Sequence, residues 1–296
     1  MSENRARAPK FPLSLGQLTP TLKTYVQHGG VRSATEAQPA ASATSTTAPH
    51  RPVLRPQHPL AHAHAPQAPQ GRPAGLGMDS DDVRKRMLSR LRTAGVRHPG
   101  VLDAMARVQR HRFVDAALVT QAYEDTSLPI GHGQTISKPS VVARMIELLF
   151  AGEVANGSGS LGRVLEIGTG CGYQAALLAL LGRQVYSIER LQALHERARL
   201  CIDRTATPNL RLIYGDGMLG HPPNAPYDSI IAAAGGDALP AAWLEQLAVG
   251  GRLVSPLRQA GTQRQVLMVV DRTERGYVHV AHEAVHFVPL KSGTGG

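Results

Sequence analysis

Residues 166–173 read EIGTGCGY and lie between an apolar segment, RVLEIG, and a helix-forming segment, GYQAALLALLG. A glycine-rich turn between a buried strand and a helix is the usual place for a nucleotide-like ligand in an open α/β sheet. Glycine lets the backbone turn sharply there and lets a ligand approach without meeting a Cβ atom. A tight turn that binds nothing is the alternative interpretation of the same residues.

The spacing within this turn indicates the kind of ligand. Gly168, Gly170 and Gly172 form G-x-G-x-G, whereas a dinucleotide-binding turn reads G-x-G-x-x-G. Glu166, at the end of the predicted strand, would repel a pyrophosphate but suits a cation. S-adenosylmethionine carries a sulfonium and an ammonium group and no phosphate, so we predict it as the cofactor.

Strands and helices alternate on the C-terminal side of the turn. Strands are predicted at QVYSIE, LRLIYGD, YDSIIAAAG and GGRLVSPL, and helices at RLQALHERARLCIDR and PAAWLEQL. QVLMVVDR and YVHVAHEAVHFV follow without a helix between them, so they should pair antiparallel. This pattern predicts an α/β fold with a doubly wound, mostly parallel Rossmann-like sheet, helices on both faces and antiparallel strands at its C-terminal end.

Acidic residues mark the ends of two further predicted strands. Glu189 ends the second strand, where a carboxylate can bind ribose hydroxyls, and Asp216 and Gly217 follow the third, where a loop can contact an adenine amino group. A solvated surface acid and a plain Asp-Gly turn are the alternatives. The carboxyl ends of consecutive parallel strands form one ligand-binding edge. The predicted cofactor-binding residues are Glu166, Gly168, Gly170, Gly172, Glu189, Asp216 and Gly217.

The chain between the tail and the sheet is predicted to be mainly helical. Apolar residues recur at helical spacing over 79–91 and 99–109, and again in SVVARMIELLF. The segment AYEDTSLPIGHGQTISKP is loop-rich, and GEVANGSGSLG is a connector. We therefore predict a domain over 78–296, with a helical substrate-side region at 78–160 and the cofactor-binding sheet at 161–296.

Residues 1–77 differ in composition from the rest of the chain. From about residue 30 they are rich in Ala, Pro, Ser, Thr and His, so they are predicted to be a disordered, low-complexity tail. Met78 opens the first well-patterned region and is an alternative start of the protein. Three histidines in the tail are interpreted as solvated side chains, and no metal site is predicted; they are His58, His62 and His64.

The positive charge belongs largely to the tail. Residues 1–77 carry eight Lys/Arg and two Asp/Glu, whereas the remaining 219 residues carry 24 and 20. A nucleic-acid-binding domain should have its own basic face, so no nucleic-acid partner is expected. Cys171 and Cys201 are too few for a secreted disulfide scaffold. Without an apolar run of ~18 residues or a signal segment, we predict a cytoplasmic protein without membrane contact, and expect a monomer.

Motifs outside the cofactor turn are more discriminating than the turn itself. They are FV at 113–114, AYED at 122–125, LPIG at 128–131, GQTIS at 133–137 and FVPL at 287–290. They resemble the signature of the protein-L-isoaspartate O-methyltransferases, which are S-adenosylmethionine-dependent enzymes of the seven-stranded methyltransferase superfamily. The resemblance covers about residues 80–290, and GQTIS is its most specific part.

The resemblance implies a protein-repair enzyme. Such an enzyme methylates the free carboxylate of L-isoaspartyl residues in damaged proteins and peptides. It implies Ser137 as the catalytic residue, with Thr135 and Ile136 beside it in the substrate site. A carboxylate is already ionised at neutral pH, so Ser137 would orient it rather than act as a base. Alternatively, Ser137 caps the helix that follows Pro139.

Some residues depart from the family's pattern, and other functions stay open. His132, Lys138 and Ser140 differ from the residues expected there, which leaves substrate affinity undetermined. A methyltransferase for another small-molecule or protein group would need no GQTIS loop. A nucleic-acid methyltransferase would carry Asn/Asp-Pro-Pro-aromatic where this chain has AAAG at 232–235. A binding module with a basic tail would bind the cofactor without turnover.

Overall fold

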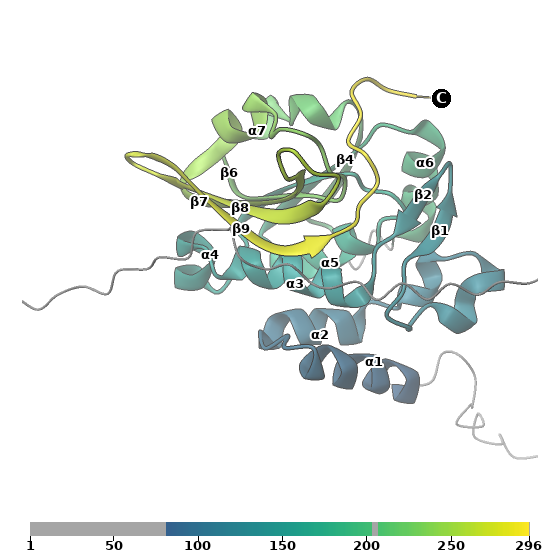
Figure 1. Ribbon diagram of the computed structural model, residues 1–296. Helices are drawn as coiled ribbons and strands as arrows, with labels where there is room; N and C mark the ends of the chain where they lie inside the picture. Colours follow the sequence, from purple (N-terminus) through teal and green to yellow (C-terminus); the bar gives the residue numbers. More distant parts are fainter. Residues whose placement is uncertain (1–80, 203–206, 296) are drawn as a thin grey trace, which may run out of the picture. The chain divides into compact units, whose positions relative to one another are not determined.

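The computed structural model describes residues 81–202 and 207–295 (Figure 1). The predicted disordered tail, its histidines and Met78 lie outside the described residues. The α-helices are α1 (Asp81–Thr93), α2 (Pro99–Arg107), α3 (Pro139–Phe150), α4 (Glu153–Ser158), α5 (Tyr173–Leu181), α6 (Gln192–Cys201) and α7 (Ala241–Gln246). The strands are β1 (Leu128–Gly131), β2 (Gln134–Ile136), β3 (Arg163–Ile167), β4 (Gln184–Glu189), β5 (Leu210–Tyr214), β6 (Tyr227–Ala232), β7 (Leu247–Arg258), β8 (Gln265–Thr273) and β9 (Gly276–Val285).

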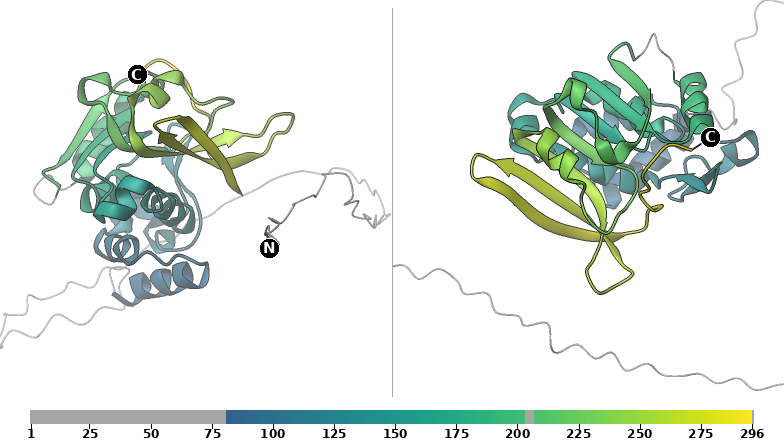
Figure 2. Two further views of the ribbon diagram at one scale, coloured as in Figure 1. Left: turned by 90° about the vertical axis from the view of Figure 1, so that its left-hand side faces the viewer. Right: turned by 90° about the horizontal axis from the view of Figure 1, so that it is seen from above.

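Seven strands form the central sheet in the order β5-β4-β3-β6-β7-β8-β9. The strands from β5 to β7 run parallel, and β8 and β9 are antiparallel to their neighbours. Figure 2 shows β8 and β9, in yellow, at one edge of the sheet. The predicted mostly parallel sheet with antiparallel C-terminal strands is confirmed.

Both faces of the sheet are covered. Along β3, Val164 packs in the core cluster that includes α3 and α5, whereas Leu165 and Ile167 pack with Trp243 of α7 on the other face. The alternation follows from the two-residue period of a strand, and burial on both faces explains why Val164, Leu165 and Ile167 of β3 are apolar. Figure 1 shows α7 above the sheet and α3, α4 and α5 below it.

The predicted helices before the sheet are confirmed. α1 buries Met87, Leu88 and Leu91, and α2 begins at a proline and buries Val101 and Met105 on the side that packs against α1 and α5. A proline in the first turn fits because the amide there has no helical partner. Within residues 81–202 and 207–295, no helix has the length and apolar character needed to cross a membrane.

The loop-rich segment contains structure that the sequence pattern did not predict. β1 and β2 form a two-stranded antiparallel hairpin around Gly131, His132 and Gly133, whose φ angles are +90°, +54° and +67°. Strands of four and three residues are too short for alternation to separate them from a loop. Their apolar residues nevertheless alternate, and Ile130 and Ile136 are buried. The expected connector likewise contains the short helix α4.

Candidate active site

Three glycines shape the turn between β3 and α5. Gly168, Gly170 and Gly172 have φ angles of +90°, +56° and +92°, a conformation that residues with a Cβ rarely adopt. Gly168 and Gly170 line a cavity. Gly172 packs inside the fold, because a Cβ there would lie 2.8 Å from the side chain of Ile202. Two of the three predicted glycines therefore line the cavity, and the third permits close packing between the turn and Ile202.

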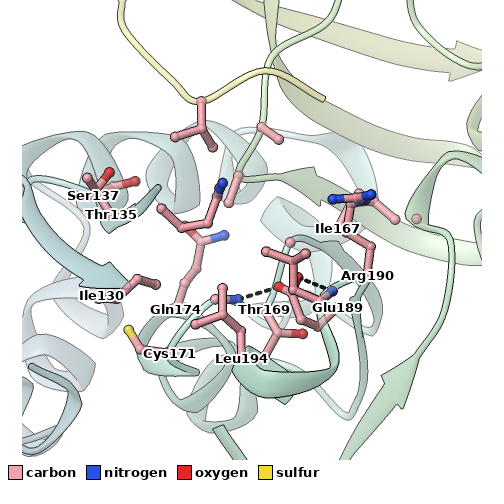
Figure 3. Close-up of a pocket in the computed structure, with 18 of the residues that line it drawn as sticks. Ile130, Thr135, Ser137, Ile167, Thr169, Cys171, Gln174, Glu189, Arg190 and Leu194 are labelled. Carbon is pink, nitrogen blue, oxygen red and sulfur yellow. Dashed lines mark hydrogen bonds between the residues drawn. The ribbon is translucent and has the colours of Figure 1, made fainter. Parts of the chain in front are cut away.

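The cavity has a volume of about 250 Å³ and lies between three parts of the chain. Its walls come from the glycine turn with the end of β4, from the segment 132–137, and from the C-terminal residues 288–291. Figure 3 shows Ser137 on one side of the cavity and Glu189 on the other. The predicted substrate loop and the predicted cofactor turn therefore meet at one cavity.

Glu189 ends β4 and holds the glycine turn in place. Its side chain is 5% exposed and lines the cavity. One carboxylate oxygen accepts a hydrogen bond from the amide of Gly170 at 2.8 Å, and the other accepts from the amide of Leu191 at 2.9 Å (Figure 3). Each oxygen retains a further lone pair. The carboxylate can therefore also accept hydrogen bonds from the two hydroxyls of a ribose.

Glu166 is fully buried and does not itself line the cavity. One of its oxygens accepts a hydrogen bond from the Ser187 hydroxyl at 2.5 Å, and that hydroxyl is 2.6 Å from the hydroxyl of Thr169. The other oxygen, Oε1, makes no hydrogen bond of normal geometry among the described residues, and the Gln174 side chain is the further polar group that interacts with this carboxyl. Burial raises the pKa of Glu166 to about 8. A carboxyl with this pKa is mostly protonated at pH 7 in the ligand-free protein, and a cation bound in front of the glycine turn would favour its ionised form.

Glu166 predicts a pH-dependent stability. Its carboxyl ionises at lower pH in the unfolded chain than in the folded protein, because the folded protein binds the proton more tightly. The contribution of Glu166 to the free energy of unfolding is therefore largest below pH 4.5 and is lost as the pH rises to about 8. Relative to Glu166→Gln, the ligand-free protein should lose up to about 5 kcal/mol of unfolding free energy across this range. Urea unfolding at several pH values measures it, with exposed Glu196→Gln as the control. Parallel curves for the wild type and Glu166→Gln would contradict the prediction.

Asp216 caps the short helix at Gly217–Leu219 and ties down the C-terminus. One carboxylate oxygen accepts from the amide of Met218 at 2.9 Å, and the other accepts from the amide of Gly293 at 2.6 Å. Gly217 lines the cavity, whereas Asp216 does not. The contact between Asp216 and an adenine amino group therefore stays a prediction, and the structure gives this carboxylate a second role.

The C-terminal segment, residues 288–295, forms a wall that the sequence did not predict. The Gly235 amide donates to the carbonyl of Val288 at 2.9 Å, at the end of the segment nearest β6. At the other end, the Gly295 amide donates to the carbonyl of Arg190 at 2.8 Å. The segment thus runs from the end of β6 to the end of β4, across the carboxyl edge of the sheet, where it is drawn in yellow in Figure 1.

Ser137 lines the cavity from the end of β2. The helix cap at α3 is Lys138 rather than Ser137, and no side-chain capping bond is made. The amide of Ser140 in the first turn is held instead by the Asp125 carboxylate at 2.9 Å. Among the described residues, the hydroxyl of Ser137 has no hydrogen-bond partner. The capping interpretation of Ser137 therefore finds no support, and its hydroxyl is available to a ligand.

Thr135 and Ile136 line the same wall. Thr135 is exposed and Ile136 is buried, because alternate residues of β2 face opposite sides. Thr135 is therefore open to a substrate beside Ser137, whereas Ile136 packs in the hydrophobic core and reaches the cavity with little exposed surface, and their contact with a substrate stays a prediction.

A family model for protein-L-isoaspartate(D-aspartate) O-methyltransferase matches residues 82–295. The chain belongs to this family. It is 54% identical over 295 residues to the protein-L-isoaspartate O-methyltransferase of Methylibium petroleiphilum, covering 99% of this chain and 100% of the relative. It is 55% identical over 296 residues to that of Leptothrix cholodnii, covering 99% and 98%.

Solved structures of the isoaspartate methyltransferase family share the fold. A protein-L-isoaspartate O-methyltransferase superposes with a TM-score of 0.63 at 27% identity, over 72% of this chain and 67% of the other. A candidate member from Plasmodium falciparum, in complex with S-adenosyl-L-homocysteine, superposes with a TM-score of 0.58 at 25% identity, over 70% and 98%. The fold that surrounds the cavity is therefore that of the family.

The residues that depart from the expected isoaspartate methyltransferase pattern have separate places. His132 lines the cavity from the tip of the hairpin, in a left-handed conformation. Lys138 is exposed and does not line the cavity. Ser140 donates its hydroxyl to Asp125 at 2.8 Å and so helps to fix the start of α3. Of the three, His132 is the one that lies where it can contact a substrate.

Sequence reasoning missed several side chains of this methyltransferase cavity. Gln174 and Leu194 project into it from α5 and α6 (Figure 3), and Lys291 lines it from the C-terminal segment. The helix residues carried no signal, because a polar or apolar side chain on a buried helix face looks like ordinary packing. The FVPL motif at 287–290 could have indicated the C-terminal wall. It belongs to the family resemblance, yet the sequence pattern indicated no function for it.

Proposed function

We propose that this protein transfers a methyl group from S-adenosylmethionine to the free carboxylate of L-isoaspartyl residues in damaged proteins and peptides. One observation carries the proposal: the GQTIS loop and the glycine turn form opposite walls of a single cavity. Membership of the family supports the choice of reaction.

The cofactor would bind along the carboxyl edge of the sheet. When bound, S-adenosylmethionine supplies an electrophilic methyl group on a positively charged sulfur. Gly168 and Gly170 leave the approach open, and Glu189 offers two acceptors for ribose hydroxyls. Buried Glu166 would favour a cationic ligand in its ionised form, which the bound cation would itself stabilise. The remaining residues proposed for this site are Gly172, Asp216 and Gly217.

The substrate carboxylate would bind at Ser137. A carboxylate is ionised at neutral pH and accepts hydrogen bonds, so the donor that it needs is a hydroxyl or an amide. The free hydroxyl of Ser137 supplies one, and Thr135 and Ile136 line the wall beside it. Ser137 thus orients the nucleophilic carboxylate without removing a proton.

Methyl transfer from labelled S-adenosylmethionine to an isoaspartyl peptide tests the function. We expect the isoaspartyl peptide to be methylated with a kcat/KM at least about 100-fold higher than its aspartyl twin, because only one places its free carboxylate correctly. The product should be a methyl ester and should therefore be lost in mild base. Equal methylation of both peptides, or a base-stable product, would instead indicate a methyltransferase acting on another group.

We further propose that residues 78–296 carry the activity, and that the protein works as a cytoplasmic monomer without nucleic acid. The family match over 82–295 supports the first statement. Cys171 and Cys201 are both free thiols, which suits a reducing compartment. The concentration of basic residues in 1–77 argues against a nucleic-acid-binding face on the folded part.

A further inference from the structure

Arg110 is a buried cation that the proposed reaction does not yet use. It begins the short helix Arg110–Phe113 and is 0% exposed. Within residues 81–202 and 207–295, it forms no salt bridge with a carboxylate. Burial lowers its pKa, against the opposing influence of Tyr173. Burying a charge costs free energy unless the group is well hydrogen-bonded, so the contacts of Arg110 should show what its burial achieves.

Its guanidinium holds two backbone carbonyls that are far apart in the sequence. Nε donates to the carbonyl of Ala122 and Nη2 donates to the carbonyl of Ser137, both at 2.7 Å. These carbonyls mark the two ends of the segment 122–137, which contains the β1–β2 hairpin and the GQTIS loop. One planar group with donors in a fixed geometry therefore closes this segment at its base.

The same guanidinium contacts the cofactor side of the cavity. Its central carbon lies 4.8 Å from the centroid of the Tyr173 ring, a cation–π contact. Tyr173 is the first residue of α5, directly after the glycine turn, and it lines the cavity. Ser137 lines it from the opposite wall. Arg110 thus contacts a residue from each wall, Ser137 and Tyr173, without lining the cavity itself.

The charge of Arg110 has no full compensation in this position. Among the described residues, Nη1 makes no hydrogen bond of normal geometry, and the Tyr173 side chain is the polar group that interacts with the guanidinium. Asp125 is the acidic residue that acts on it electrostatically, but this carboxylate is hydrogen-bonded to Ser140 and forms no salt bridge with Arg110. A positive charge in a low-dielectric interior acts strongly on an anion bound nearby. A carboxylate at Ser137 is such an anion.

We propose that Arg110 is a positioning residue for the substrate loop, which fixes the backbone at Ser137 and makes that wall of the cavity favourable to a carboxylate. The inference rests on the proposed function. Arg110 does not line the cavity, so it acts through Ser137 and through its charge rather than by touching the substrate. A lysine would keep the charge but could not bridge both carbonyls in this geometry, and a methionine would keep only the volume.

Arg110→Lys and Arg110→Met test the proposal, with Arg252→Lys as the matched control. Arg252 also donates to a backbone carbonyl, that of Leu148 at 2.9 Å, and it pairs with Asp271 outside the cavity. For each protein we would measure thermal unfolding, S-adenosylmethionine affinity by calorimetry, and kcat and KM on an isoaspartyl peptide. A fourth measurement is the binding preference for that peptide over its neutral isoasparaginyl analogue.

Positioning predicts a specific pattern across these measurements. Both Arg110 variants should lose about 10-fold to 100-fold in kcat/KM while cofactor affinity changes less than about 3-fold. Arg110→Met should also lose most of the preference for the carboxylate peptide, and Arg110→Lys should retain part of it. Arg252→Lys should melt earlier yet keep its kcat/KM and its preference.

Other results would overturn the proposal. Wild-type kinetics and preference in Arg110→Met would do so directly. If neither variant folds, or if activity and cofactor affinity fall together in proportion to the folded fraction, Arg110 is structural only. A wild-type protein that methylates no isoaspartyl peptide contradicts the proposed function instead, and the peptide-binding preference then still decides whether Arg110 favours a carboxylate.

Discussion

Replacing Gly168 with valine is expected to abolish binding of S-adenosylmethionine. Gly168 has a φ of +90° and lines the cavity beside Ala233, whose Cβ would lie 3.5 Å from a new Cβ. The protein itself therefore leaves room for that atom, but the added methyl groups would occupy space at the cavity wall. A β-branched residue at this φ also costs about 1–3 kcal/mol and would rotate the turn out of shape. We expect affinity to fall at least about 100-fold, which is about 2.7 kcal/mol or more.

Gly95→Val separates backbone strain from loss of the site. Gly95 lies between α1 and α2 with a φ of +98°, and a Cβ there would have no atom within 4 Å. The two substitutions therefore impose similar strain, but only one lies at the cavity. Calorimetry should show unchanged cofactor affinity for Gly95→Val together with a lower melting temperature. Normal binding by a folded Gly168→Val protein would remove the glycine turn from the cofactor site.

The sheet could be predicted from sequence because its signals are local and repeated. The apolar run of β3, the glycines after it and the helix pattern that follows each indicate the same supersecondary unit. Chain connectivity and the handedness of crossovers then leave few topologies, and the structure supplies the strand order. The β1–β2 hairpin escaped prediction because its register depends on Gly131 and Gly133 at the turn rather than on a long alternation.

The candidate site could be predicted only where the residue type reveals the role. Glu189 could be placed at the cavity because it ends a parallel strand at the ligand-binding edge of the sheet, whereas its contact with a ribose stays a prediction. Asp216 looked similar, yet its carboxylate also holds Gly293, a contact made across 77 residues that local sequence cannot indicate. Arg110 carried no signal at all, since its partners are backbone carbonyls that every residue possesses. Roles exerted through the backbone become visible only in the folded structure.

Ser137→Ala is expected to lower turnover on an isoaspartyl peptide while leaving cofactor affinity unchanged. Its hydroxyl is free of partners among the described residues and faces the cavity opposite Glu189 (Figure 3). Removing one hydrogen bond that orients the carboxylate in the transition state should cost about 10-fold to 1,000-fold in kcat. Stability should change little, because Lys138 rather than Ser137 stands at the cap of α3.

Ser140→Ala is the matched control, because it deletes the same hydroxyl three residues further along the chain. Ser140 donates to Asp125 at 2.8 Å and does not line the cavity, so its loss should cost about 1 kcal/mol of stability and little activity. If Ser137 is catalytic, Ser137→Ala should therefore lose activity and keep its stability, whereas Ser140→Ala should lose stability and keep its activity. Equal losses of activity in both would mean that the start of α3 has shifted. Wild-type turnover in Ser137→Ala would leave the substrate carboxylate without its proposed donor, and the catalytic assignment of Ser137 would be wrong.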